Sequence, residues 1–144
     1  MAEIAPDEGL DLILTIFPMG GTNLTTTHVA LFTSFTASTV GTAGQVADAY
    51  TEPTGGGYAR QQLVAASWGA IAAGTGGRKT TASQVTYGVA SGDYSANVNG
   101  FWIANQLSAS GDKAIFAANF DDAAAVDVNS GDTIKVTAAF QYSN

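Results

Sequence analysis

Residues 133–142 read Thr-Ile-Lys-Val-Thr-Ala-Ala-Phe-Gln-Tyr, and their regular alternation of side chains is the strongest indication of the fold class. A period of two places alternate residues on opposite faces of an extended chain, so this stretch predicts a half-buried β-strand. The positions expected on its apolar face are Ile134, Val136, Ala138, Phe140 and Tyr142.

Similar short segments, rich in β-branched and aromatic residues, recur upstream and are separated by turns rich in Gly, Ser and Asn. Segments 98–106 and 113–120 flank residues 108–112, which predicts a β-hairpin. The chain is therefore expected to be mainly β, an antiparallel β-sandwich of either jelly-roll-like or immunoglobulin-like type. The further strands are expected over residues 27–33, 58–64 and 80–90.

The first twenty residues differ in pattern and predict one short helix or arm, with residues 21–144 forming the β-sandwich domain. Ala5-Pro6-Asp7-Glu8 is typical of a helix start, because Pro suits the first turn and carboxylates favour that end of the helix dipole. Pro18 ends the pattern. We expect the apolar face either to contact a partner or to cap one open end of the sandwich; it comprises Leu10, Ile13, Leu14 and Phe17.

Two stretches have a less definite pattern. Residues 34–56 are rich in Ser, Thr, Gly and Ala and predict a long loop. The Ala-rich residues 63–73 suit a helix as well as a strand, and both remain open.

Charge is scarce, with twelve acidic and five basic residues in 144 and a formal net charge of −7. A soluble domain is usually about a quarter charged, and that charge keeps free monomers apart. Five cations cannot follow a phosphate backbone, so nucleic acid is not an expected partner. The acidic start has no basic n-region and no apolar run reaches about 20 residues, so neither a secretory signal nor a membrane span is expected. We interpret the chain as a component of a protein assembly.

Catalytic groups are few, and no enzyme activity, metal or cofactor is predicted. His28 is the only histidine and there is no cysteine. A histidine at the start of a strand is expected to be half exposed.

Residues 74–81 superficially resemble a phosphate-binding loop, but Arg78 stands where that loop needs Gly before Lys79. A hairpin loop that carries two cations, and contacts an acidic neighbouring subunit, is the preferred interpretation.

Five oxygen-bearing side chains gather in residues 121–132, where calcium is one possible ligand. The spacing does not match an EF-hand loop and the final Glu is missing. Asn129-Ser130-Gly131-Asp132 instead has the composition of a turn. Adjacent Asp121 and Asp122 would point to opposite faces of a strand, which disfavours a paired-carboxylate hydrolase.

The aromatic residues offer two alternatives, core packing or anchoring of an interface. Phe101 and Trp102 are adjacent, so their rings are expected on opposite faces of a sheet, one buried and the other exposed or covered by a partner. Trp68 follows the same reasoning. Aromatic side chains are enriched at binding hot spots, which makes these residues interface candidates as well.

Several phrases occur together in one order: Val29-Ala-Leu-Phe-Thr33, Gly57-Tyr-Ala-Arg-Gln61, Trp68, Gly100-Phe-Trp-Ile103 and Ser130-Gly-Asp-Thr-Ile-Lys-Val-Thr137. In these phrases the chain resembles small virion structural proteins of tailed bacteriophages and cyanophages, including capsid decoration (cement) proteins. The resemblance spans about residues 8–142. It implies a β-rich subunit, a homotrimer, on the outer capsid surface of the virion, and structural roles for Tyr58 and Arg60.

The resemblance leads to two expectations of function. The first is a decoration protein that stabilises the phage head by bridging subunits of the major capsid protein, its partner. Each trimer would bind through several weak sites, so that avidity replaces single-site affinity. The alternative is a tail or baseplate component, a structural or receptor- or carbohydrate-binding module in which exposed Trp102, Tyr94 and Tyr142 would stack on sugar rings.

Overall fold

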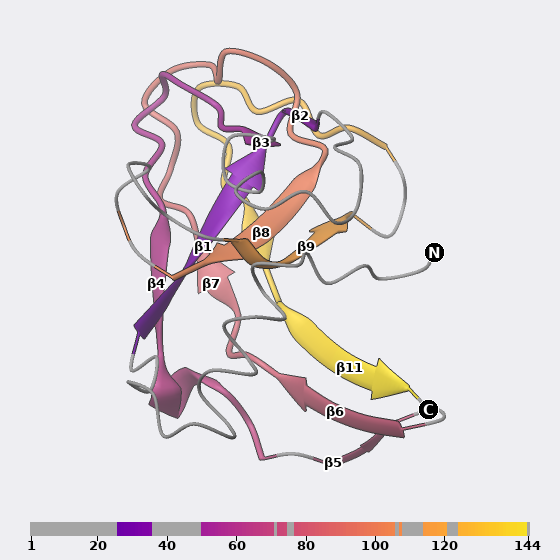
Figure 1. Ribbon diagram of the computed structural model, residues 1–144. Coiled ribbons are helices and arrows are strands. Elements are labelled where there is room, and N and C mark those ends of the chain that lie inside the picture. Colours follow the sequence, from indigo (N-terminus) through magenta and orange to yellow (C-terminus); the bar gives the residue numbers. More distant parts are fainter. Residues whose placement is uncertain are drawn as a thin grey trace.

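The structure is a computed structural model of the 144-residue chain, shown in Figure 1. It describes residues 26–35, 50–70, 72–74, 77–105, 107, 114–120 and 124–143. The strands are β1 (Thr26–Phe32), β2 (Ser34–Phe35), β3 (Tyr50–Thr51), β4 (Gln61–Val64), β5 (Ala72–Gly74), β6 (Gly77–Thr81), β7 (Val85–Thr86), β8 (Gly100–Ala104), β9 (Ala114–Asn119), β10 (Lys135–Val136) and β11 (Ala139–Ser143). Within these residues the single helical element is the 3-10 turn η1 (Ala65–Ser67), and no helix that could cross a membrane is found.

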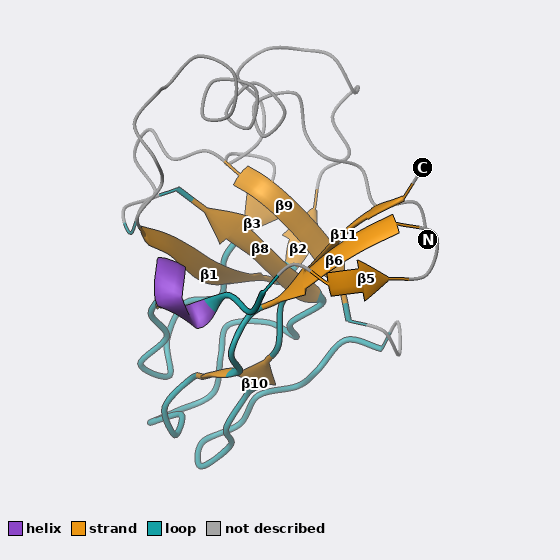
Figure 2. Ribbon diagram, turned by 90° about the horizontal axis from the view of Figure 1, so that it is seen from below, coloured by secondary structure: helices purple, strands orange, loops and turns teal. Residues whose placement is uncertain are grey.

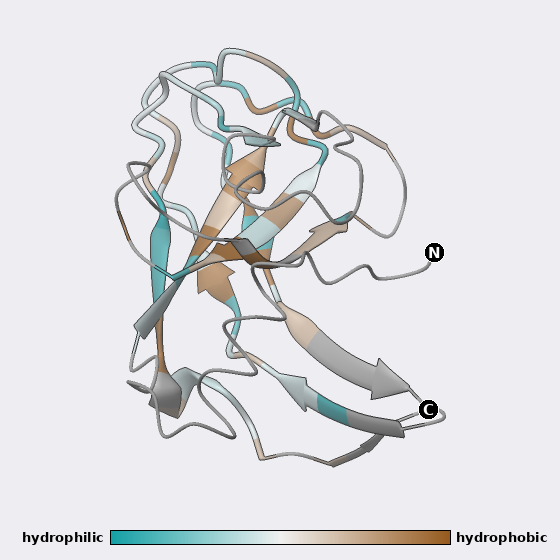
Figure 3. Cartoon of the chain, in the orientation of Figure 1, coloured by the Kyte–Doolittle hydropathy of each residue, from teal (hydrophilic) through white to brown (hydrophobic). Residues whose placement is uncertain are grey.

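A four-stranded antiparallel sheet, in the order β4-β1-β8-β9, forms the centre of the molecule. Strand β1 lies inside this sheet, paired with β4 on one side and β8 on the other. Its sequence, Thr-Thr-His-Val-Ala-Leu-Phe, is uncharged apart from the titratable histidine, as a strand covered on both faces requires. In Figure 3, which is coloured by hydropathy, the brown of hydrophobic residues marks much of β1.

The two faces of the central sheet bury different sets of residues. One face contributes Val29, Leu31, Leu63, Phe101 and Ile103 to the main hydrophobic core. The opposite face carries a smaller cluster of Ala30, Phe32, Trp102 and Ala104, with Tyr50 and Ala117 packed against it. The alternation of strand side chains thus produces two apolar layers from a single sheet.

An irregular second layer covers the main core. Residues 82–98 and 126–138 run antiparallel, and backbone hydrogen bonds join them at intervals, from Tyr87 N to Ile134 O (2.9 Å) and from Tyr94 N to Val128 O (3.0 Å). Only β7 and β10 are regular enough to count as strands here. Figure 2 shows this loop-rich layer, with β10, on one side of the central sheet.

Strands β5, β6 and β11 form a separate three-stranded sheet, in the order β11-β6-β5. It continues the second layer, because Ala139 pairs with Thr81 directly after Ala82 N donates to Ala138 O. In Figure 1 these strands extend away from the central sheet. We call this three-stranded sheet the arm.

The expected mainly β, antiparallel fold is confirmed, while the sandwich topology stays a prediction. The expected hairpin is present as β8 and β9. Residues 133–138 alternate between exposed and buried as predicted, although the strand is divided into β10 and β11. The single strand expected over residues 80–90 is likewise divided, into β6 and β7. The ambiguous segment 63–73 passes from β4 through η1 to β5.

Other expectations fall partly or wholly outside the described residues. These include the N-terminal helix with Leu10, Ile13, Leu14 and Phe17, and most of the loop expected over residues 34–56. The described ends of that loop form the short sheet of β2 and β3, in which Ser34 pairs with Thr51.

Candidate functional site

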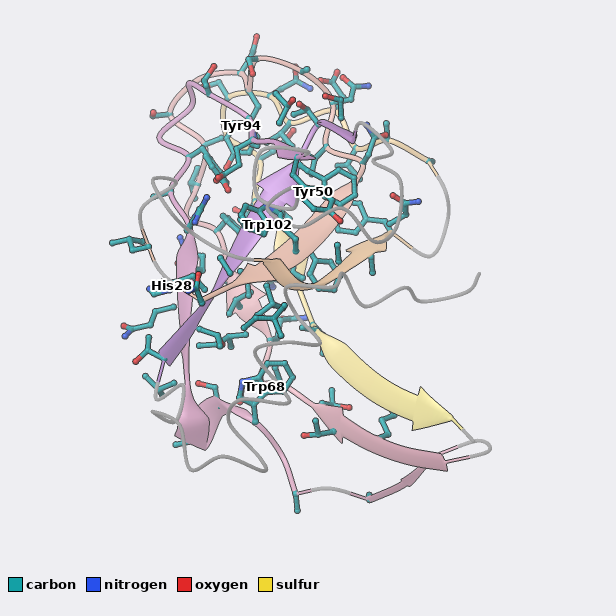
Figure 4. The ribbon with its side chains drawn as sticks, viewed as in Figure 1. His28, Tyr50, Trp68, Tyr94 and Trp102 are labelled. Atoms are coloured by element: carbon teal, nitrogen blue, oxygen red, sulfur yellow. The ribbon has the colours of Figure 1, made fainter. Side chains whose placement is uncertain are left out.

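The smaller cluster is centred on the Trp102 ring, which is fully buried. Tyr50 stacks on it with ring centroids 5.5 Å apart and an interplanar angle of 13°. The Phe32 ring also packs against Tyr50, with ring centroids 5.3 Å apart and an interplanar angle of 52°. Figure 4 shows Tyr50 and Trp102 side by side over the central strands. Strand β3 is thereby held on the face of the sheet by aromatic stacking.

Arg60 adds a cation to this cluster, and we name Phe32, Tyr50, Arg60 and Trp102 the Trp102 cluster. The guanidinium carbon lies 4.7 Å from the centroid of the Trp102 ring. Arg60 directly precedes β4, whereas Trp102 lies on β8, with β1 between them. The small Ala30 of β1, paired with Trp102, leaves room for the two side chains to meet. A desolvated cation–π contact of this kind is worth about 2 kcal/mol.

The carboxylate of Glu52 balances the Arg60 charge. Arg60 Nε donates to Glu52 Oε1 (3.0 Å) and Oε2 (3.2 Å), and the terminal nitrogen also forms an ion pair with Oε1. The Arg60 side chain is 5% exposed and that of Glu52 is 21% exposed. Breaking such a pair leaves an uncompensated charge in a poorly solvated site, so each partner depends on the other.

Tyr58 joins this ion pair to the central sheet. Its hydroxyl donates to Glu52 Oε2 (2.6 Å) and accepts from the Leu31 backbone N–H (3.0 Å). Its ring stacks on Tyr87 at 5.9 Å. Burial, reinforced by the hydrogen bond to Glu52, raises the pKa of Tyr58 well above its usual value. The hydroxyl is therefore a fixed, neutral bridge and not a proton donor in chemistry near neutral pH.

Glycine conformation makes this arrangement possible. Gly55, Gly56 and Gly57 all have positive φ, at 79°, 57° and 74°. The chain reverses there, and Tyr58 N donates to Gly55 O at 3.0 Å. L-residues with side chains rarely adopt three such conformations in succession. This turn brings Glu52 back beside Tyr58 and Arg60.

Two buried nitrogen atoms near the cluster have no hydrogen-bond partner among the residues that the structure describes. They are His28 Nδ1 and Trp102 Nε1. His28 is 9% exposed, so the expectation of a half-exposed histidine is wrong: the residue lies within β1 and the sheet covers it. Desolvation, and secondarily the Arg60 charge, lower the pKa of His28. A neutral imidazole is the favoured form in the folded protein.

The Trp102 cluster, together with Glu52 and Tyr58, forms a structural brace in which the carboxylate of Glu52 binds both the Arg60 guanidinium and the Tyr58 hydroxyl. The only ion pair found in the described part of the chain is internal, between Arg60 and Glu52. No group of three His, Asp or Glu side chains able to hold a metal occurs among the described residues. The arrangement can fix β3, β4 and the central sheet relative to one another.

The residues singled out from the sequence are only partly brought together. Tyr58, Arg60 and Trp102 lie close together, joined through Glu52 and the Trp102 ring. Trp68 lies elsewhere, half-buried against the main core and bridged to Ala82. Phe101 and Trp102 do lie on opposite faces of the sheet, but both are buried, so neither ring is exposed on this chain.

Sequence reasoning missed Tyr50 and Glu52. Both precede the glycine turn, in a segment interpreted as loop. One signal was available, because Glu52 is the only carboxylate between residues 49 and 92, eight positions before an isolated arginine. An isolated pair of opposite charges flanking three consecutive glycines is compatible with an ion pair across a chain reversal.

The remaining motifs take structural forms. Gly74 pairs with Gly77, so the phosphate-loop-like stretch belongs to the β5–β6 hairpin of the arm, as expected. The two cations, Arg78 and Lys79, lie within strand β6 and not in the loop where they were expected. Asp132 Oδ2 accepts from Asn129 N (2.9 Å) and Gly131 has φ 96°, which makes residues 129–132 a turn. Asp121 and Asp122 lie outside the described residues.

Comparison with protein-family models, with curated proteins and with solved structures finds no match for this chain.

Proposed function

We propose that this chain is a structural subunit of a protein assembly, and specifically a capsid decoration (cement) protein of a bacteriophage virion. In this role it acts by binding and not by catalysis. It occupies the outer surface of the head and bridges neighbouring subunits of the major capsid protein.

The observation that carries this proposal is the small number of charged residues, one of which, Arg60, is buried. Arg60, one of only five basic residues, is buried in an internal ion pair and adds nothing to the surface. Apolar side chains are exposed instead, with Val89 70% and Leu107 61% accessible. An exterior with so little charge favours contact with other subunits over a dispersed monomer.

The acidic balance supports a position away from packaged nucleic acid. With a net charge of −7, the subunit is repelled by phosphate at moderate ionic strength. An outer surface of a shell meets this requirement, while a channel or portal surface in contact with DNA does not.

The phrases that carry the resemblance lie in the framework of the fold. Val29–Thr33 includes most of β1, Gly57–Gln61 leads into β4, and Gly100–Ile103 is most of β8. A likeness in these positions supports a shared architecture. It concerns the framework of the fold and transfers no binding surface.

The carbohydrate-binding alternative is less well supported. It required exposed rings at Trp102 and Tyr94, yet the Trp102 ring is fully buried and Tyr94 is 9% exposed. Buried rings cannot stack on a sugar without unfolding part of the brace. The side chain of Tyr142 lies outside the described residues.

Immunogold labelling of phage particles that contain this chain tests the proposed position. We expect label distributed over the head shell. Label confined to the tail or baseplate would favour the alternative, and intact particles without label would overturn the virion assignment.

Light scattering coupled to size-exclusion chromatography tests the proposed self-association. A homotrimer has three times the chain mass of 14.6 kDa. A mass of one chain over the whole micromolar range would contradict a self-associating subunit.

A further inference from the structure

The only asparagine–glycine pair in the sequence, Asn99-Gly100, stands where β8 begins. An asparagine side-chain amide can be attacked by the backbone nitrogen of the following residue. Glycine allows this attack most readily, because it has no side chain in the way and its backbone turns freely. In an unfolded chain this pair is therefore chemically labile.

The reaction is a spontaneous deamidation. The Gly100 nitrogen gives up its proton and bonds to the side-chain carbonyl carbon of Asn99, and the amide nitrogen leaves as ammonia. The cyclic succinimide then takes up one water molecule and opens to aspartate or isoaspartate at position 99. One water is consumed and one ammonia is released, so no further reactant is needed.

The fold holds the asparagine in place on both sides of β8. The backbone N–H of Asn99 donates to Phe32 O (2.8 Å), and its carbonyl accepts from Phe120 N (3.1 Å). Its side-chain Nδ2 donates to Thr33 O. The half-buried amide that would have to react is thus fixed against the end of β1.

The attacking nitrogen is held as well. Gly100 is buried and lies between two strands, opposite Phe32 on β1 and Asn119 on β9. Its nitrogen can turn toward the Asn99 side chain only after the start of β8 has separated from a neighbouring strand. Such local opening is the step that native structure makes rare.

Packing and hydrogen bonding together keep this labile pair in the sequence. A Cβ at Gly100 would collide with the Phe32 ring and with the backbone of β9, so no residue with a side chain fits there. Asn99 supplies the side-chain donor that the Thr33 carbonyl accepts, and aspartate cannot replace it because its carboxylate only accepts.

We propose that Asn99 is a modification site controlled by the fold. The native sheet prevents its deamidation, opening at the start of β8 permits it, and the product cannot re-form the same sheet. The reaction then leaves a one-way record of unfolding on each chain. This inference does not depend on the capsid role.

The product is excluded from the native sheet for two reasons. A carboxylate oxygen at position 99 would face the Thr33 carbonyl oxygen, so two acceptors would meet where a hydrogen bond had been. Isoaspartate also adds a carbon atom to the backbone before Gly100, which shifts the pairing of β8 with β1 and β9. Trp102, two residues further along β8, would lose its place in the brace.

Peptide mapping of the full chain by mass spectrometry tests the control by the fold. Loss of Asn99 is followed in native buffer and in unfolding guanidinium chloride, at the same mildly alkaline pH and temperature. We expect the unfolded chain to lose Asn99 faster by about tenfold or more, because the native reaction waits for local opening. Exposed Asn97 is the internal control, since the branched side chain of Val98 obstructs attack, and it should react slowly in both conditions.

A comparison without denaturant uses Tyr58→Phe, which removes one connection between the brace and β1. It should increase the rate of Asn99 loss in native buffer. The consequence of the modification is measured with Asn99→Asp, which should lower the folding equilibrium constant by about tenfold or more in equilibrium denaturation. Asn97→Asp, the same chemical change at an exposed position, should have little effect.

Three results would overturn the proposal. Equal rates of Asn99 loss in the native and unfolded chain would show that the fold does not control the reaction. Survival of Asn99 in the unfolded chain would show that the site is not labile. An Asn99→Asp protein as stable as Asn97→Asp would show that the sheet accepts the product.

Discussion

At the scale of single residues, the Tyr58 hydroxyl is the connection that joins the Glu52–Arg60 pair to the central sheet. It satisfies one buried backbone donor and one carboxylate oxygen together. Residues with two such partners contribute more than a single average hydrogen bond, because removing them leaves both partners unsatisfied. The ring itself packs against Tyr87 and Tyr94. A substitution to Phe therefore removes the hydroxyl and its hydrogen bonds but keeps the ring packing.

Tyr58→Phe should lower the free energy of unfolding by about 1–3 kcal/mol, since the Leu31 N–H and a Glu52 oxygen lose their partner while the ring packing is kept. Urea denaturation monitored by tryptophan fluorescence measures the change. Tyr94→Phe is the matched control, because no hydrogen bond of the Tyr94 hydroxyl is found in the described structure; its effect should stay below about 0.5 kcal/mol. Equal effects in the two variants would show that the bridge contributes nothing.

His28 makes stability depend on pH. Its folded-state pKa is lowered by desolvation and by Arg60, so the unfolded chain binds the proton more readily. Stability is complete above the unfolded pKa of about 6.5 and is lost as the pH falls through the lower folded value. We expect the urea midpoint of the wild type to fall between pH 7 and pH 5.

His28→Gln removes this titration and should flatten the profile in that interval. Measuring both proteins at half-unit steps separates the histidine from carboxylates, which titrate mainly below pH 5. If the urea midpoints of the wild type and the variant change with pH by the same slope, His28 is not the cause of the pH dependence.

At the scale of elements, the start of β8 is packed too closely for any side chain. A Cβ on Gly100 would lie 2.7 Å from Phe32 Cζ and 2.8 Å from Asn119 Cα, and would also meet the Ala118 carbonyl. Two of these three neighbours are backbone atoms of β9, which cannot move without breaking the ladder. The close approach of β8 to β9 therefore requires glycine here.

Gly100→Ala should destabilise the fold by about 1–3 kcal/mol, the usual range for overpacking. Gly88→Ala is the control, because a Cβ at Gly88 has no neighbour within 4 Å. It should change stability by less than about 0.5 kcal/mol. Thermal melts of the two variants side by side are sufficient, and a Gly100→Ala protein as stable as the control would contradict the packing described for β8 and β9.

At the scale of the whole molecule, the described part of the chain exposes charges of both signs, on Lys79 and Lys135 and on Asp93, Asp127 and Asp132. Contacts between exposed opposite charges are screened by salt, with a Debye length of about 10 Å at 0.1 M and about 3 Å at 1 M. Raising sodium chloride from 0.05 to 1 M should therefore shift the oligomer toward smaller species at fixed protein concentration. Analytical ultracentrifugation measures this shift.

The melting temperature of the subunit provides the internal control for that experiment, since the core is apolar and its one described ion pair is mostly buried. Salt should change it little. An oligomer that grows with salt would indicate association through apolar surface, because excluded salts strengthen burial.

By itself, the sequence determined where the chain is extended. Side-chain alternation located the exposed and buried positions of residues 133–138, and β-branched and aromatic composition located β1 and the β8–β9 hairpin; both signals are local. Composition likewise determined the low charge, and hence the expectation of an assembly. The tertiary structure decided which side chains meet: that Trp102 is buried under Tyr50 and Arg60, and that Glu52 returns across three glycines to Arg60. Strand order, register and the path of a glycine turn set these contacts. They join residues far apart in the chain, and a local periodicity holds no information on which strand becomes the neighbour.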